Sequence, residues 1–193
     1  MNGRDWLISS FNLSPSTSNF AERKAKEYSN KKVKSTNNTA IRLIKHGNDN
    51  GIVSSETQTK GKGQRENKWI SKKGNLFISI FFKINSKFSL KKITTTNLSI
   101  LKKIISNQVT KKINIKLPND ILIGKKKVCG ILQEIIYQNN HKYLIVGIGI
   151  NIISSPNILN YPTTYLNKYS KKKINKIKII NNIKLNFEKK YKG

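Results

Sequence analysis

Two stretches decide the fold: Lys127-Val-Cys-Gly-Ile-Leu-Gln-Glu-Ile-Ile-Tyr137 and Tyr143-Leu-Ile-Val-Gly-Ile-Gly-Ile-Asn-Ile-Ile153. Both are rich in β-branched and apolar residues, and the polar run at 139–141 between them is typical of a turn. They predict two long antiparallel strands joined in a hairpin. Glycine weakens a strand, so the glycines inside both stretches indicate either a bulge or another group that lies close against the backbone.

Outside this hairpin, apolar spacing predicts the other strands and helices. Residues 76–82 (Leu-Phe-Ile-Ser-Ile-Phe-Phe) are too apolar for a half-exposed strand and indicate a buried one. The same rules predict a short helix from Ala40 to Ile44 that is capped within 35–37 and ends near Gly47, and then a strand that starts at 51–53 before a polar stretch at 54–64. Further along, they predict a helix at 90–109 and short strands at 113–117 and 120–123. An irregular link around Pro156 and Pro162 and a lysine-rich helix at about 174–191 complete the prediction. Together they predict an α+β fold: a mixed, largely antiparallel sheet with helices packed on it.

Net charge is the most unusual property of the composition. The chain has 193 residues, which suits one domain, and a formal charge of +29, which would attract a polyanion. Four of the 38 basic residues are arginines (Arg4, Arg23, Arg42 and Arg65), and the rest are lysines spread through every segment. Because base recognition and bidentate phosphate contacts favour arginine, we interpret most of this charge as solvated surface and expect no specific DNA partner.

The cysteine and histidine counts exclude several kinds of site. Cys129 is the single cysteine, and His46 and His141 are the two histidines, so a disulfide framework, a multi-cysteine zinc site and a His-rich metal centre are excluded. No apolar run approaches the length of a membrane span, and the N-terminus lacks the layout of a secretory signal. We therefore expect a cytoplasmic protein with no membrane partner. Residues 1–28, which have few periodic apolar positions, are expected to form a poorly ordered extension.

A glycine-punctuated basic loop, Gly61-Lys62-Gly63-Gln64-Arg65, is the first candidate binding element. Glycines allow the backbone to approach a ligand closely, and successive amides beside a lysine and an arginine favour an anion. The loop is not a Walker motif, because it lacks the Gly-Lys-Ser/Thr ending. A flexible surface loop is an equally good interpretation of this segment alone.

A second candidate, Lys116-Leu117-Pro118-Asn119-Asp120, lies at the junction of two short expected strands. Proline fixes a bend there, which places a lysine and an Asn-Asp pair at one corner. These residue types suit a phosphate, held by the lysine, and a magnesium ion, held by the oxygens. An Asn-Asp turn without a ligand is the alternative.

Taken in order, these stretches resemble the biotin–protein ligase family. The resemblance is carried by Ser35-Thr36-Asn37, Gln58-Thr59-Lys60-Gly61-Lys62-Gly63-Gln64-Arg65 with Trp69, Gly74-Asn75-Leu76-Phe77, Lys116-Leu117-Pro118-Asn119-Asp120, Lys127-Val128-Cys129-Gly130-Ile131-Leu132 and Gly147-Ile148-Gly149-Ile150-Asn151. It implies that residues 29–193 form a ligase catalytic domain, of which 170–193 are the C-terminal lysine-rich helix. It also implies a reaction in two steps. Biotin and ATP, with Mg²⁺, give biotinyl-5′-AMP, and biotin then passes to a lysine of the biotin carboxyl carrier domain of acetyl-CoA carboxylase.

The resemblance further implies a role for each matching residue. Lys116 would hold the α-phosphate, and Lys127 the biotin carboxylate or the adenylate bridge; these two are the expected catalytic residues. Hydrogen bonds to the ligand, including its ureido ring, are expected from Ser35, Thr36, Asn37 and Gln58. The loop over the adenylate would consist of Gly61, Lys62, Gly63, Gln64 and Arg65. Trp69 would lie against the adenine, Asn151 at its polar edge with Gly149 beside it, and Asn119 at the phosphates. Mg²⁺ would bind through Asn119 or Asp120.

Three positions depart from the family pattern. The family usually has arginine where this chain has Lys62, glycine where it has Glu66, and tryptophan where it has Leu117. The first two changes are expected to weaken the hold of the loop on the adenylate, and the third to affect packing. Neither the DNA-binding domain nor the small C-terminal domain of larger family members is expected, which predicts a minimal ligase of reduced activity.

Two other functions compete with this interpretation. One is a lipoate- or octanoate-type acyltransferase on the same fold, and the other is a non-catalytic protein that binds polyanions. The sequence leaves the oligomeric state open, with a homodimer through strand edges as one alternative.

Overall fold

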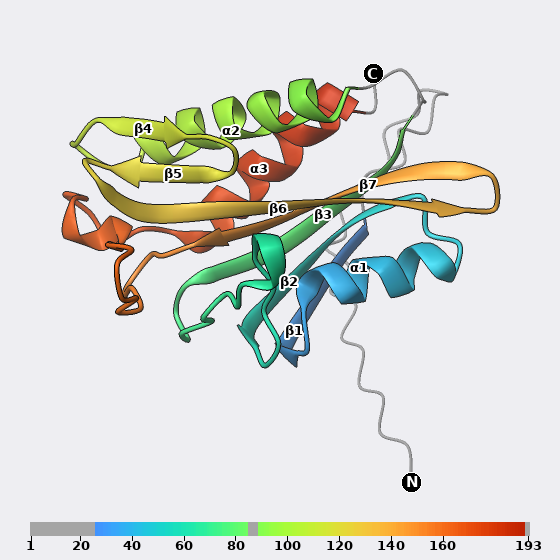
Figure 1. Cartoon of the computed structure of the whole chain (residues 1–193), viewed down its shortest axis with the longest axis horizontal. Coiled ribbons are helices and arrows are strands. Elements are labelled where there is room, and N and C mark those ends of the chain that lie inside the picture. Colours follow the sequence, from blue (N-terminus) through green and yellow to red (C-terminus); the bar gives the residue numbers. More distant parts are fainter. Residues whose placement is uncertain (1–25, 85–88, 192–193) are drawn as a thin grey trace, which may run out of the picture.

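The hairpin expected from the sequence forms the middle of the sheet. Its strands are β6 (Lys126–Gln138) and β7 (His141–Ile150), which pair antiparallel from Cys129 opposite Ile150 to Gln138 opposite His141. Asn139 and Asn140 make the turn with positive φ angles, a conformation that asparagine tolerates better than most residues. In this computed structural model, which describes residues 26–84 and 89–191, the hairpin belongs to a seven-stranded sheet (Figure 1).

The sheet has the strand order β1-β2-β3-β7-β6-β5-β4. The other strands are β1 (Lys26–Val33), β2 (Asn50–Gln58), β3 (Leu76–Ile84), β4 (Ile113–Lys116) and β5 (Asp120–Ile123). β1 and β2 pair in parallel, and every other neighbouring pair is antiparallel. The sheet is therefore mixed and largely antiparallel, which confirms the α+β prediction.

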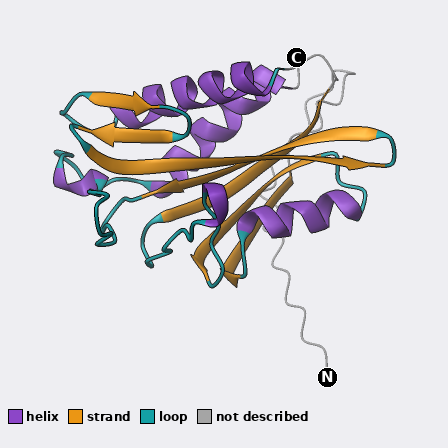
Figure 2. Ribbon diagram, viewed as in Figure 1, coloured by secondary structure: helices purple, strands orange, loops and turns teal. Residues whose placement is uncertain are grey.

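Helices cover both faces of the sheet (Figure 2). Helix α1 (Thr36–Lys45) lies on one face, where Ala40 and Ile44 pack with Val53 and Phe81 in a small core. The opposite face carries α2 (Leu90–Ser106) and α3 (Lys176–Tyr191), which enclose the larger core. The buried positions of α3 recur every fourth residue at Ile179, Ile183, Phe187 and Tyr191, so its lysine-rich sequence still presents one apolar stripe to the protein.

The prediction from the sequence omitted strand β1 and ended strand β2 too early. β1 has the sequence KEYSNKKV, whose polar residues hide its strand character, so the predicted extension at 1–28 is wrong for residues 26–28; residues 1–25 lie outside the described part of the chain. β2 continues to Gln58 rather than ending before the polar stretch. The polar residues are compatible with a strand there because β1 pairs with its backbone as far as Gln58, and β3 pairs with it as far as Ser55.

β7 ends at Ile150, three residues before the predicted end, because Asn75 redirects the chain. The Asn75 side-chain oxygen accepts hydrogen bonds from the backbone N–H groups of residues 152, 153 and 154 at 2.9, 3.0 and 3.4 Å. The helices follow the expected ranges, with α2 ending three residues early and α3 starting two residues late. Across residues 26–84 and 89–191, the structure has no helix with both the length and the apolarity that a membrane span requires.

Candidate active site

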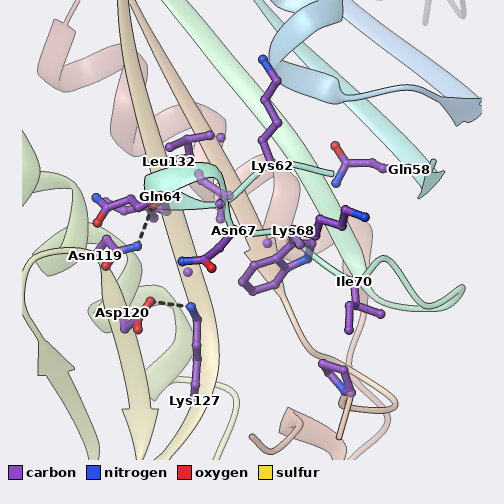
Figure 3. Close-up of a pocket in the computed structure, with 18 of the residues that line it drawn as sticks. Gln58, Lys62, Gln64, Asn67, Lys68, Ile70, Asn119, Asp120, Lys127 and Leu132 are labelled. Carbon is purple, nitrogen blue, oxygen red and sulfur yellow. Dashed lines mark hydrogen bonds and ion pairs between the residues drawn. The ribbon is translucent and has the colours of Figure 1, made fainter. Parts of the chain in front are cut away.

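A cavity of about 520 Å³ lies where α1, the loop after β2, the β4–β5 corner and the link after β7 meet (Figure 3). It is lined by 14 residues that the sequence nominated: Ser35, Thr36, Asn37, Gln58, Lys62, Gly63, Gln64, Arg65, Trp69, Asn119, Asp120, Lys127, Gly149 and Asn151. Gly61 and Lys116 are not among its lining residues. Segments separated by more than 100 residues thus converge on one hollow.

One side of the cavity is a network of uncharged side chains, which we call the neutral wall: Thr36, Asn37, Gln58 and Ser79. The Gln58 side-chain oxygen accepts hydrogen bonds from the Thr36 backbone N–H at 2.8 Å and from the Thr36 hydroxyl at 3.1 Å. The Ser79 hydroxyl is 2.8 Å from Thr36 Oγ1 and also contacts Asn37 Oδ1. Because these groups bind one another, their positions are set before any ligand arrives.

The neutral wall begins at the first turn of α1. Ser35 caps this helix with its side chain, and the following two residues are buried on the sheet. Asn37 lies so close to β7 that a Cβ built on Gly147 would be 2.2 Å from its side-chain oxygen. Its amide nitrogen contacts Glu134 Oε2 on β6 at 2.5 Å. The glycine in the strand therefore makes room for a side chain of the site, as its position in the sequence indicated.

The basic loop is a closed turn anchored at both ends. Trp69 donates a backbone hydrogen bond to Gly61 at 2.9 Å, and Gly63 donates one to Asn67 at 2.6 Å. Arg65 adopts a left-handed conformation at the tip (φ 52°, ψ 45°). In Figure 3 the Lys62 side chain extends away from the Asp120–Lys127 pair. The loop is thus shaped by its own backbone hydrogen bonds.

Trp69 lies flat against the sheet between the two strands of the central hairpin. A Cβ on Gly149 would be 2.4 Å from the indole, and one on Gly130 would be 2.8 Å from it. The indole nitrogen is buried without a hydrogen-bond partner among the described residues. Since buried donors are normally paired, this N–H is an unsatisfied donor in a residue that lines the cavity.

The opposite side of the cavity is ionic: Asp120, Lys127 and Tyr161 line it, and Lys116 stands at its edge. We call these four residues the charged wall. Lys127 Nζ is 2.7 Å from Asp120 Oδ1, and the two side chains are only 17% and 9% exposed (Figure 3). The Tyr161 hydroxyl donates to the other oxygen of Asp120. Burial, followed by this hydrogen bond, raises the pKa of the Tyr161 phenol above its ordinary value.

Lys116 stands at the edge of this wall rather than inside the cavity. It is the last residue of β4 and is exposed, and its ammonium lies 4.7 Å from the centroid of the Tyr161 ring. Nearby, Asn119 donates from its side-chain amide to the Ile131 carbonyl at 3.3 Å. The corner motif thus brings Lys116, Asn119 and Asp120 together, as its proline indicated.

Asn151 closes the end of the cavity near the link after β7. Its amide nitrogen donates to the Thr164 carbonyl at 3.1 Å. Its side-chain oxygen is buried and has no hydrogen-bond partner in the described part of the chain. This oxygen and the Trp69 indole N–H are therefore an unused acceptor and an unused donor at one cavity.

Sequence reasoning missed four groups that shape this site: Tyr161, Glu134, Ser71 and Ser79. Tyr161 lies in an irregular link without periodicity, so no pattern marked it. Glu134 is a charged residue within an apolar strand, which was a usable signal. Ser71 accepts a hydrogen bond from the Gln58 amide at 3.1 Å, and only the fold brings these two together.

The donor set limits how a metal ion can bind. No group of three or more His, Cys, Asp or Glu side chains is placed to hold a metal within the described ranges. The corner offers one carboxylate, Asp120, and one amide, Asn119. This set fits Mg²⁺ that is also bound by substrate phosphates, since Mg²⁺ in proteins is commonly held by one or two carboxylates with phosphates and water.

Comparisons with known proteins agree with this architecture. Residues 29–151 match the model of the biotin/lipoate A/B protein ligase family. The bifunctional ligase/repressor BirA of Bacillus subtilis is 32% identical over 174 residues, covering 83% of this chain and 52% of BirA. The chain spans about half the length of the curated relatives it matches.

Solved structures show the same fold. The biotin protein ligase of Aquifex aeolicus, in complex with biotin and ATP, aligns with a TM-score of 0.71 at 24% identity over 84% of this chain and 68% of that one. The ligase of Leishmania major, in complex with biotinyl-5-AMP, aligns with a TM-score of 0.70 at 21% identity over 86% and 75%. Since the family match runs from within β1 to the first residue after β7, and so includes the sheet that carries the cavity, the chain belongs to the biotin/lipoate A/B protein ligase family.

Proposed function

We propose that this chain joins biotin to ATP to form biotinyl-5′-AMP and then transfers biotin to a lysine of a carrier domain. The observation that carries the proposal is a single cavity with a preformed uncharged hydrogen-bonding wall on one side and an ionic wall on the other. Biotin has the same division, with a neutral ureido ring at one end and a carboxylate at the other. The names of the relatives support this substrate over others.

The neutral wall is suited to the ureido ring. Thr36 and Gln58 supply hydroxyl and amide groups within a buried network, and a buried polar ring must have its hydrogen bonds satisfied. Ser35 and Asn37 line the same part of the cavity. Because the network is already connected, the ring would bind without much reordering of side chains.

The charged wall is suited to the reacting anions. A biotin carboxylate oxygen would attack the α-phosphorus of ATP, forming a C–O–P bond and releasing pyrophosphate. Lys127 would neutralise the carboxylate and the new bridge, and Lys116 the α-phosphate, so that charge on the transferring group is matched by fixed cations. In the second step the amine of a carrier lysine would attack the acyl carbon, lose a proton and release AMP.

The loop and its tryptophan would cover the nucleotide. Gly61, Lys62, Gly63, Gln64 and Arg65 would close over the adenylate, with Trp69 against the adenine and Asn151 at its polar edge. The unpaired Trp69 N–H and Asn151 oxygen support this assignment, because each is a buried unsatisfied polar group that the nucleotide would pair with once side chains move on binding. Closure would also keep water from the reactive mixed anhydride.

Mg²⁺, held by Asp120 together with Asn119, would supply further positive charge at the phosphates. In this structure Asp120 is bound to Lys127 and Tyr161. The protein would therefore contribute one carboxylate and one amide, and ATP the remaining oxygens.

The test is incubation of the protein with biotin, α-labelled ATP and Mg²⁺, followed by separation of the labelled products. We expect labelled biotinyl-5′-AMP that depends on biotin. A thermal-shift competition between biotin and lipoate separates the two substrate classes of the family, since only the true ligand stabilises the folded protein at low concentration. Stabilisation by lipoate alone would contradict the proposal.

The second step needs a carrier, and we propose the biotin carboxyl carrier domain of acetyl-CoA carboxylase. Transfer is measured by streptavidin detection of the carrier after incubation with biotin and ATP. A carrier whose acceptor lysine is replaced with arginine is the matched control. Labelled adenylate without transfer to the intact carrier would contradict this choice of partner and leave the first step standing.

A further inference from the structure

Tyr161 contacts every other member of the charged wall. Its ring centroid lies 4.7 Å from Lys116 Nζ and 5.4 Å from Lys127 Nζ. Its hydroxyl donates to Asp120, whose other oxygen is bound by Lys127. One side chain thus touches both lysines of the proposed reaction and the carboxylate between them.

The position of Tyr161 is fixed by the backbone next to it. Lys127 donates its backbone N–H to the Pro162 carbonyl at 2.9 Å, and the Thr164 N–H donates to the Lys127 carbonyl at 2.8 Å. The Thr164 carbonyl in turn accepts from Asn151. Residues 162–164 are therefore hydrogen-bonded to Lys127 in β6 and to Asn151, which follows β7. These bonds also fix the position of Tyr161, the residue before them.

An aromatic ring at this point offsets the repulsion between the two lysine ammonium groups. Two ammonium groups that must act on one anion repel each other, and the exposed Lys116 has a long, flexible side chain. The negative face of a phenol ring attracts a cation within about 6 Å of its centre. Tyr161 therefore favours those conformers of Lys116 and Lys127 in which both ammonium groups lie beside the same ring.

We propose that Tyr161 is a positioning residue of the adenylation site: its ring holds the Lys116 and Lys127 ammonium groups toward one phosphate, and its hydroxyl restrains Asp120. The proposal rests on the proposed function, because it names the residue that aligns the two cations of that reaction. Tyr161 itself makes no bond to the reacting atoms and is not a catalytic residue.

Complementary variants separate the ring from the hydroxyl. Tyr161→Phe keeps the ring and loses the hydrogen bond to Asp120, whereas Tyr161→Gln keeps a donor and loses the ring. Tyr161→Leu is a second ringless variant in case glutamine disturbs folding. Tyr165→Gln is the matched control, because Tyr165 is in the same link and half-buried like Tyr161, but does not line the cavity.

The measurements are the single-turnover rate of adenylate formation and, separately, the affinity for biotin. We expect the ringless variants to lose at least about tenfold in rate. Biotin affinity should fall less than the rate, because the neutral wall holds the ureido ring and Asp120 still holds Lys127 in the ringless variants. Tyr161→Phe should stay within about threefold of wild type, and Tyr165→Gln should match it. Wild-type rates in folded ringless variants, or equal losses in Tyr161→Gln and Tyr165→Gln, would overturn the proposal.

A second readout does not depend on activity. Binding of inorganic pyrophosphate at 0.2 M salt, followed by calorimetry, reports whether the two ammonium groups converge on one anion. We expect about tenfold weaker binding in the ringless variants than in Tyr165→Gln. If wild type forms no adenylate, the proposed function fails, and this measurement alone decides the role of Tyr161; equal pyrophosphate affinities would overturn it.

Discussion

The neutral wall and the charged wall face the same cavity but are built differently. Thr36, Gln58 and Ser79 are held by hydrogen bonds to one another, and they come from a helix and two strands that the core fixes in place. The charged wall is held by one ion pair and by the rings of Tyr161 and Trp69, and Lys116 stands exposed at its edge. The neutral wall can bind a neutral group as it stands, whereas the charged wall must exchange partners when an anion arrives.

The largest effect is expected from Lys116→Ala. Because Lys116 is exposed, its removal should leave the fold intact while adenylate formation falls by about 100- to 1,000-fold, the usual loss for one preorganised electrostatic contact to a transition state. Lys125→Ala, an exposed lysine beyond the far end of β5, is the control and should keep wild-type activity. Full activity in Lys116→Ala would show that this lysine plays no part in adenylate formation.

The second prediction concerns the Asp120–Lys127 pair. Asp120→Ala should lower the free energy of unfolding by about 3 kcal/mol, because it leaves a largely buried ammonium without its counter-ion. Denaturant titration measures this loss. The double variant Asp120→Ala/Lys127→Met should recover most of it, since no unpaired charge remains. Equal losses in the single and double variants would show that the pair is not the source of the stability.

The third prediction compares two glycines of β7 that contact different parts of the cavity. Gly147→Ala should displace Asn37 and weaken biotin binding by about tenfold, whereas Gly149→Ala should displace Trp69 and chiefly accelerate loss of the adenylate. Calorimetry with biotin and the rate of adenylate release measure the two effects. If both variants weaken biotin binding equally, Asn37 and Trp69 do not serve different parts of the ligand.

The smallest effect is a change in tyrosine titration. The raised pKa of Tyr161 means that its protonated form is favoured by folding, so this contribution to stability is complete below the ordinary tyrosine pKa of about 10 and is lost as the pH rises through the folded-state value. Burial also raises the pKa of Tyr143 and of Tyr191, so absorbance at alkaline pH should show several late-ionising phenols, and Tyr161→Phe should have one fewer than wild type. Gln58→Leu, a change in the neutral wall, should leave that signal in place.

Much of the fold follows from the sequence because the central strands are strongly apolar. The hairpin, the buried strand β3 and the fold class were predicted from spacing alone, and the strand glycines correctly indicated close contacts at the site. β1 was missed because its stability comes from pairing with β2 rather than from apolar residues. Such tertiary pairing leaves no periodic signal.

The site was predicted less completely than the fold, and the difference is physical. Residues within motifs, such as Gln58 and Lys127, line the cavity as expected. Lys116 does not line it, because β4 ends at the cavity edge and the side chain turns to the Tyr161 ring. Tyr161 itself lies in an irregular link, whose course depends on hydrogen bonds to strands that are distant in sequence. Its role is visible only in three dimensions.

The hydrogen bonds between residues 162–164 and Lys127 limit where the chain can be truncated. The region shared with the family model finishes at residue 151, yet a polypeptide cut there would retain all seven strands while losing helix α3 and also the phenol and the carbonyl that brace Lys127 and Asn151. The piece that keeps this bracing is therefore longer than the piece recognisable by homology. Deletion or fusion experiments should place their junctions after Tyr191, because α3 also encloses the larger core.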